Sequence, residues 1–141
     1  MAKAKKVTLL TIRVPDKVGQ LAAIAELLAT AKVNITALAA SESGDNAEIY
    51  IVADRTKKAK SALASLGADV KDEEALRIDL QNKPGSLLKV SRKIAQAGVN
   101  VRRSWVTAFS GKTAACLLVT SDNEKAAAAL AAKKEKKPVS P

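Results

Sequence analysis

Two short segments, DKVGQL at positions 16–21 and NKPGSL at positions 82–87, carry the same pattern. Each has an Asp or Asn, then a Lys, then a glycine at the fourth position and a Leu at the sixth. The shift between the two segments is 82 − 16 = 66, and the same shift aligns Val33-Asn34 with Val99-Asn100. Self-similarity at a fixed spacing of this length indicates two copies of one structural unit.

The shift becomes 67 beyond this point, where Ser43-Gly44 aligns with Ser110-Gly111. One residue has therefore been added in the second copy, between about positions 101 and 109. Because this stretch is rich in strand-forming residues, the added residue predicts a β-bulge.

The first copy has the pattern strand, helix, strand, strand, helix, strand. Apolar residues recur at helical spacing in two stretches, and β-branched residues gather in the others. The order β-α-β-β-α-β is the ferredoxin-like unit, an α+β fold with an antiparallel sheet and helices on one face. The expected strands are 7–14, 33–41, 47–53 and 68–71, and the expected helices are 19–31 and 56–66, with a hairpin turn at 43–46.

The second copy repeats this order. We expect strands at 76–80, 99–109 and 113–120, and helices at 86–97 and from the cap Asp122 or Asn123 to 132. The fourth strand, near 137–140, is expected to be poor because Pro138 lies within it and Pro141 follows it. The predicted domains are 7–73 and 75–140, with basic tails at 1–6 and 133–141. A unit of this size buries only about 60% of its surface alone, so we expect the two copies to pack together.

Composition excludes several classes of function. Of the 141 residues, 48% are hydrophobic and 27% are charged. These proportions are typical of a globular protein rather than a disordered one. The chain has no histidine, which excludes the usual catalytic triads and histidine zinc sites. The single cysteine, Cys116, lies in an apolar run and is expected to be a buried hydrophobe. We therefore expect no catalytic residue, no metal and no cofactor.

The net charge of +10 raises the question of a nucleic-acid partner. Residues 3–6 and 133–137 each contribute +3, so basic tails flank a body of +4. Aromatic residues make up only 2%, which disfavours base stacking, so nucleic acid is not expected as the main partner. No apolar run approaches the length of a membrane span and no signal peptide is evident, so the expected location is cytoplasmic, with no membrane partner.

The repeated loop joins the first strand to the first helix in each copy. A glycine at a helix start allows close approach, and the first helical amides are unpaired and partially positive, so they suit a carboxylate. The oxygen of Asp16 or Asn82 can accept a hydrogen bond from an ammonium group. Together these groups suit a free α-amino acid. The structural alternative is that Asp16 and Asn82 cap their helices and that Asn34 and Asn100 are turn residues.

The chain resembles the ACT domain family, as a tandem pair, in the pattern Asp16-Lys17-Val18-Gly19-x-Leu21 with Val33-Asn34 and in its counterpart from Asn82 to Asn100. The resemblance covers about residues 7–133 and implies a non-catalytic protein that binds an amino acid where two domains meet. It also implies a homodimer and a separate regulated enzyme or a transcription partner of unknown identity. The implied sites are Asp16, Val18, Gly19, Gln20 and Leu21 with Asn100 across the interface, and Asn82, Pro84, Gly85, Ser86 and Leu87 with Asn34.

The two loops differ in charge. Asp16 offers a carboxylate to an ammonium group and Asn82 only an amide oxygen, so the Asp16 site should bind more tightly. The second loop resembles the serine-binding loop of phosphoglycerate dehydrogenase regulatory domains, except that Leu80 stands where that pattern has a histidine. This leaves the identity of the amino acid open.

The sequence leaves three alternative functions to be distinguished. The sequence favours an amino-acid sensor. The alternative is a ferredoxin-like protein that binds nucleic acid through its basic tails, together with Arg102 and Arg103, which we otherwise expect to form an exposed charged edge. An acylphosphatase-like hydrolase would need an arginine in the loop, which neither copy has. Trp105 is expected to be partly buried.

Overall fold

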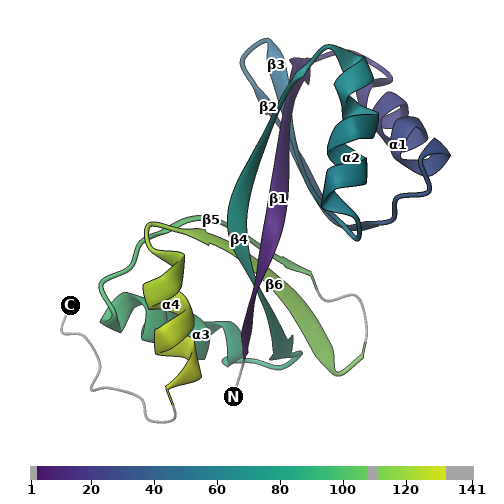
Figure 1. Ribbon diagram of the computed structural model, residues 1–141. Helices are drawn as coiled ribbons and strands as arrows, with labels where there is room; N and C mark the ends of the chain where they lie inside the picture. The colour runs from purple at the N-terminus through teal and green to yellow at the C-terminus, as the bar shows by residue number, and fades with distance from the viewer. Residues whose placement is uncertain (1–2, 108–110, 133–141) are drawn as a thin grey trace. The chain divides into compact units, whose positions relative to one another are not determined.

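The computed structural model describes residues 3–107 and 111–132 (Figure 1). Strands and helices follow each other in the expected order. In chain order they are β1 (Ala4–Pro15), α1 (Gln20–Thr30), β2 (Ile35–Ser43), β3 (Asn46–Ala53), α2 (Thr56–Leu63), the 3-10 turn η1 (Ala64–Leu66), β4 (Asp69–Gln81), α3 (Ser86–Gln96), β5 (Val101–Thr107), β6 (Thr113–Thr120) and α4 (Asn123–Ala131).

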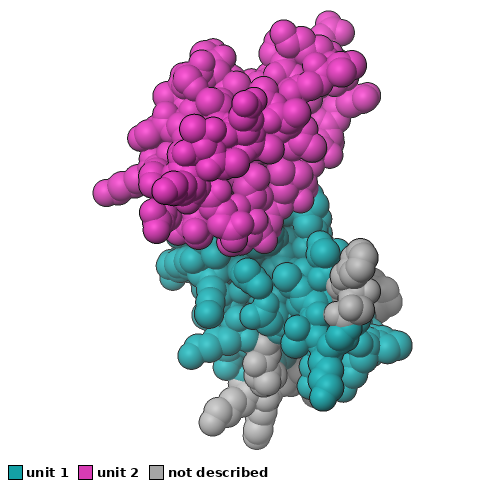
Figure 2. Space-filling view, turned by 90° about the vertical axis from the view of Figure 1, so that its right-hand side faces the viewer, with its two compact units in different colours: residues 1–7, 74–141 teal, residues 8–73 magenta. Residues whose placement is uncertain are grey.

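The chain divides into two compact units, coloured separately in Figure 2. Unit 2 comprises residues 8–73, and unit 1 comprises residues 1–7 and 74–141. The strand order of the six-stranded sheet is β2-β3-β1-β4-β6-β5. Strands β1 and β4 each begin in one unit and end in the other, so each unit contains part of both.

In unit 2, β3 pairs antiparallel with both β1 and β2. Helices α1 and α2 cover one face of these strands (Figure 1). Alternate residues of β1 and β3 point toward the helices, because side chains alternate along a strand. The core beneath the helices is formed by Leu10, Ile12, Val14, Ile24, Leu28, Val33, Ile49, Ile51, Ala59 and Leu63, all at most 6% exposed.

Unit 1 repeats this arrangement. Strand β6 pairs antiparallel with β4 and β5, and its core lies beneath α3 and α4. The core residues are Leu76, Ile78, Leu80, Val90, Ile94, Val99, Ala114, Cys116, Leu118, Ala126 and Leu130. Asp122 caps α4, since its Oδ1 accepts a hydrogen bond from the Lys125 amide at 3.0 Å, as expected. The α+β fold with antiparallel strands is confirmed.

The fourth strand of each unit differs from expectation. The strands expected at 68–71 and 76–80 are one continuous strand, β4, because no glycine or proline interrupts residues 69–81. Its first part contributes Val70 to the margin of the unit 2 core. In unit 1, the start of β1 packs Ala4 against the core, and Lys6 forms an ion pair with Glu124 of α4. The strand expected at 137–140 lies outside the described residues.

A register irregularity falls in β5 between Val101 and Arg103, but β2 has the same irregularity between Ile35 and Ala37. These positions are equivalent at the shift of 66, so the bulge is common to both copies and is not the added residue. Thr107 pairs with Ala115, and Ser41 pairs with Glu48. Thr107 is therefore the counterpart of Ser41, and the shift between the copies is still 66 at this position. The added residue therefore follows Thr107, the last residue of β5.

Candidate functional site

The two loop glycines have nearly identical backbone conformations. Gly19 has φ +91° and ψ −1°, and Gly85 has φ +89° and ψ −11°. These values lie in the left-handed region, which side chains other than that of glycine rarely adopt. A Cβ built on either glycine would meet no atom within 4 Å. The glycines are therefore required for backbone conformation, and the space beside each is open.

Each glycine is the N-cap of its helix, and neither cap uses a side chain. The carbonyl of Gly19 accepts from the Ala23 amide, and that of Gly85 from the Lys89 amide, each at 3.0 Å. The interpretation of Asp16 and Asn82 as helix caps was wrong, because the left-handed glycine separates these side chains from the helix start. The amide groups of the first turn thus have no capping side chain in either copy.

Both loops are tied to the hairpin turn of their own unit. The Asp16 amide donates to the Asp45 carbonyl at 2.9 Å, and the Asn82 amide donates to the Lys112 carbonyl at 2.8 Å. The Nδ2 of Asn82 also donates to the Gly111 carbonyl at 3.1 Å, a bond that does not use its Oδ1 acceptor. The backbone geometry of the two loops is therefore fixed in the same way.

The loops are exposed over most of their length. Asp16, Gly19 and their counterparts Asn82 and Gly85 are exposed, and Val18 is fully exposed at 103%. Leu21 and Leu87, in the first turns of α1 and α3, are 48% and 46% exposed. The position of Gln20 is fixed, since its Nε2 donates to the Pro15 carbonyl at 2.9 Å. Pro84 is exposed, and Ser86 is half-buried.

Asn34 and Asn100 lie at the other end of their sheets. In unit 2, Pro15 pairs with Asn46, so the 16–19 loop lies beside the turn between β2 and β3. Ile35 pairs with Ala53 at the opposite end of the same strands, and Asn34 immediately precedes Ile35. One unit therefore does not bring its own loop and asparagine together, and a site that uses both needs a second unit.

Charged residues around the two loops differ in sign. The first loop has Asp16 and, across the turn, Asp45, with Lys17 between them in sequence. The equivalent places in the second loop hold Asn82, Lys112 and Lys83. The first loop thus favours a cationic group and the second an anionic one.

Two further residues, missed by sequence reasoning, hold the asparagines. The Asn34 amide donates to Asp54 Oδ1 at 2.9 Å, and the Asn100 amide donates to Ser121 Oγ at 2.9 Å. Asp54 and Ser121 are equivalent at the shift of 67, so the repeat itself would have revealed them as a matched pair. Both asparagine residues are exposed.

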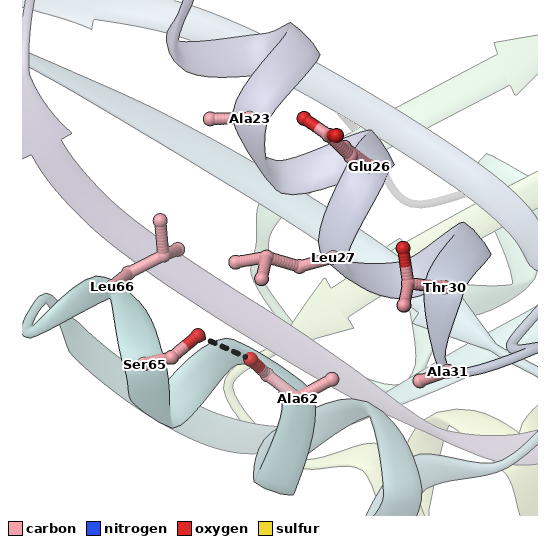
Figure 3. A pocket seen from close by; sticks show the side chains of 8 residues that line it. All are labelled: Ala23, Glu26, Leu27, Thr30, Ala31, Ala62, Ser65 and Leu66. Carbon is pink, nitrogen blue, oxygen red and sulfur yellow. Dashed lines mark hydrogen bonds between the residues drawn. The ribbon is translucent and has the colours of Figure 1, made fainter.

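A groove of about 590 Å³ lies between α1 and α2 in unit 2 (Figure 3). Leu27 points into it from α1, and Leu66 and Ala62 line the opposite wall. Glu26, Thr30 and Ser65 are the polar residues along it. The groove includes none of the residues predicted for the amino-acid site, and it is lined mainly by small aliphatic side chains.

The cysteine, the leucine before the second loop, and the arginines and tryptophan of β5 are packing or surface groups. Cys116 is fully buried, and burial raises the pKa of its thiol to about 11, so it is a core residue rather than a nucleophile. Leu80 is 5% exposed and belongs to the unit 1 core. Arg102 is exposed on β5, which is an outermost strand of the sheet order, while Arg103 and Trp105 are half-buried. Within the described ranges, no cluster of three potential metal ligands occurs.

The ACT domain family model matches residues 8–68. Among solved structures, protein BT0572 from Bacteroides thetaiotaomicron is similar with a TM-score of 0.84 and 26% identity, covering 90% of this chain and 88% of that one. The ligand-free regulatory subunit of aspartate kinase from Thermus thermophilus has a TM-score of 0.70 at 17% identity, covering 92% and 91%. The Thermus flavus regulatory subunit gives 0.67 at 18% identity, with the same coverage. No curated protein sequence matches significantly.

Residues 8–68 are thus similar to an ACT domain, and the length and repeated topology of the chain fit a tandem arrangement of two such domains. The match of residues 8–68 to this family supports a regulatory role in amino-acid sensing. In the part of the chain that the structure describes, no helix is long and apolar enough to cross a membrane.

Proposed function

We propose that this protein is a non-catalytic sensor that binds a free amino acid where two ACT units meet. The observation that carries the proposal is the pair of left-handed glycines at positions 19 and 85, each of which starts a helix without a capping side chain. Uncapped amides at a helix start attract a carboxylate. Asp16 and Asn82 supply oxygen acceptors for the ammonium group of the same ligand.

The proposed sites each combine a loop with an asparagine from a second unit. The first has Asp16, Val18, Gly19, Gln20 and Leu21 with Asn100, and the second has Asn82, Pro84, Gly85, Ser86 and Leu87 with Asn34. The opposite placement of loop and asparagine within a unit supports this pairing. The proposal includes a homodimer in the cytoplasm that acts on a separate regulated enzyme or transcription partner.

A thermal-shift screen with the free amino acids, one at a time, tests the proposal. A ligand at a hundredfold excess over its dissociation constant adds about 2.7 kcal/mol to the stability of the folded state. We expect one chemical class of amino acid to raise the melting temperature while the corresponding decarboxylated amine does not, because the amine lacks the group that binds the helix amides. Equal melting temperatures with every amino acid would contradict the proposal.

Two variants, each of which gives one loop the acceptor residue of the other, test the roles of the loops. Asp16→Asn removes the charge-assisted bond to the ammonium group, and we expect about fivefold weaker binding, because a hydrogen bond to a charged group exceeds a neutral one by roughly 1 kcal/mol. Asn82→Asp should strengthen binding at the second site. Asp69→Asn, an exposed substitution away from both loops, is the matched control. Isothermal titration calorimetry measures all three.

A further inference from the structure

The groove between α1 and α2 in unit 2 has an equivalent place in unit 1, where a lysine side chain crosses from one helix to the other. At the shift of 66, Leu27 of the groove corresponds to Lys93 of α3. At the shift of 67, Ser65 of the groove corresponds to Ala132 at the end of α4. Lys93 is 8% exposed, and its Nζ donates a hydrogen bond to the Ala132 carbonyl at 3.1 Å.

This arrangement in unit 1 suits both parts of the lysine side chain. Its methylene groups can lie along apolar helix surface, as the stems of long cationic side chains commonly do. Its ammonium group lies at the carboxyl end of α4, where backbone carbonyl groups are partially negative and lack partners within the helix. The space between the two helices of this unit is therefore suited to an alkyl chain that ends in an ammonium group.

Unit 2 has the corresponding space and acceptors but not the lysine. Leu27 stands in its place, and the groove beside it has a volume of about 590 Å³ (Figure 3). Ala23, Ala62 and Leu66 supply apolar walls. Ser65 lies in η1, at the carboxyl end of the second helix, where the backbone again presents partially negative carbonyl groups.

The charge at the groove is the reverse of that in unit 1. Glu26 lines the groove, whereas its counterpart on α3 is Arg92, and α1 contains no Lys or Arg. Within residues 3–107 and 111–132, Glu26 has no salt-bridge partner. A carboxylate without a partner beside an apolar groove favours a cationic ligand over a neutral or anionic one. Apolar walls and negative charge together suit an alkylammonium group.

We propose that the groove between α1 and α2 binds a lysine side chain of a partner protein, held as Lys93 is held in unit 1. The groove is several times larger than one butyl chain, so backbone beside the lysine can lie in it too. Glu26, Thr30 and Ser65 along the groove are exposed. An open groove suits a protein segment better than a free small molecule, because small molecules bind mainly in pockets that bury most of their surface.

An NMR titration of the full chain, isotopically labelled at its leucine methyl groups, tests the proposal. The probe is the peptide acetyl-Ala-Lys-Ala-amide, and the matched peptide has norleucine, which keeps the alkyl chain but lacks the ammonium group. We expect the lysine peptide to shift the methyl signals of Leu27 and Leu66. It should bind about fivefold more tightly than the norleucine peptide, because only the ammonium group forms charge-assisted hydrogen bonds.

Three variants separate the groove from the rest of the surface. Glu26→Gln should weaken binding of the lysine peptide about threefold, because the carboxylate is lost. Glu42→Gln, an exposed substitution on β2 that removes the same charge outside the groove, is the matched control and should bind as wild type. Leu27→Lys supplies the ammonium group from the chain itself, so the Leu66 signal should no longer respond to the peptide. Circular dichroism confirms that each variant is folded.

Several results would overturn the proposal. These are no binding of the lysine peptide, equal binding of the two peptides, equal weakening by Glu26→Gln and Glu42→Gln, or unchanged binding to Leu27→Lys. Binding of free n-pentylamine without binding of the lysine peptide would overturn the assignment to a partner protein. The groove shares no residue with the proposed amino-acid sites. The amino-acid screen is therefore repeated with Leu27→Lys, so that failure of either proposal is seen independently of the other.

Discussion

Asn34 and Asp54 are joined by two hydrogen bonds: the Asn34 amide donates to Asp54 Oδ1 at 2.9 Å, and the Asp54 amide donates to the Asn34 carbonyl at 3.0 Å. Asn100 and Ser121 have the same two bonds in unit 1, at 2.9 and 2.8 Å. A short acceptor at this position therefore fixes the residue before the edge strand in both copies, whether that acceptor is a carboxylate or a hydroxyl.

Asp54→Ala should destabilise the protein by about 1 kcal/mol, because the Asn34 amide loses its partner. Asp54→Ser should cost less, since Ser121 performs this role in the second copy. Urea unfolding measures both variants. Equal stability of Asp54→Ala and wild type would show that the bond contributes nothing.

Gly19→Ala and Gly85→Ala should each cost about 1 kcal/mol, because alanine must adopt a left-handed conformation. Each substitution should also weaken amino-acid binding at its own loop. Gly67→Ala is the matched control, since Gly67 also has a positive φ of 64° but follows η1 and belongs to neither loop. Its melting temperature should fall similarly. A loss of binding by all three variants would show that strain, and not the loop, affects the ligand.

Lys32→Gly should stabilise the protein by up to about 1 kcal/mol, because glycine adopts a left-handed conformation without steric cost. Lys32 has a φ of +59°, and its counterpart at the shift of 66 is Gly98, with φ +74°. The second copy thus has the residue that this conformation favours. The converse substitution, Gly98→Lys, should destabilise unit 1. Thermal unfolding measures both, and a lower melting temperature for Lys32→Gly would contradict the argument.

Stability should decrease above pH 9 through Cys116. Burial raises the pKa of its thiol from 9.0 to about 11. Between these values the unfolded chain loses the thiol proton and the folded chain keeps it, so the free energy of unfolding falls as the pH rises. Cys116→Ala removes this contribution and should show a flatter dependence over that range, although its overall stability is lower.

The same burial predicts a kinetic result for Cys116. A neutral aromatic disulfide reagent should label the native protein at pH 8 far more slowly than the urea-unfolded protein, because the reactive thiolate is scarce and inaccessible. Rapid labelling of the native protein would contradict the structure.

The order of elements could be predicted from the sequence because local patterns determine it. Apolar residues at helical spacing located α1 and α3, and Gly44, Gly67 and Gly98 marked turns and helix ends with positive φ. The continuity of β4 could not be read from residues 71–74, which are charged and resemble a linker. Strand β4 is hydrogen-bonded to β1 and β6, and single-sequence patterns do not report such pairings.

The geometry of the two loops could likewise be predicted only in part from the sequence. Their position and their need for glycine followed from the repeat, but the absence of side-chain caps did not. Asp and Asn at this spacing are typical helix caps. Only the left-handed backbone conformation of Gly19 and Gly85 shows that the side chains of Asp16 and Asn82 do not cap the helices. The opposite placement of Asn34 and its own loop required the strand register.

The pairing of Lys6 with Glu124, which are far apart in the sequence, has a consequence for synthesis. Residues 4–7 leave the ribosome before the rest of the unit to which they belong, and that unit is complete only after α4 has emerged. Unit 2 uses nearby segments and can form earlier, whereas unit 1 must close a very long loop, which slows folding. Trimming residues 1–7 would therefore damage unit 1, which is completed after unit 2.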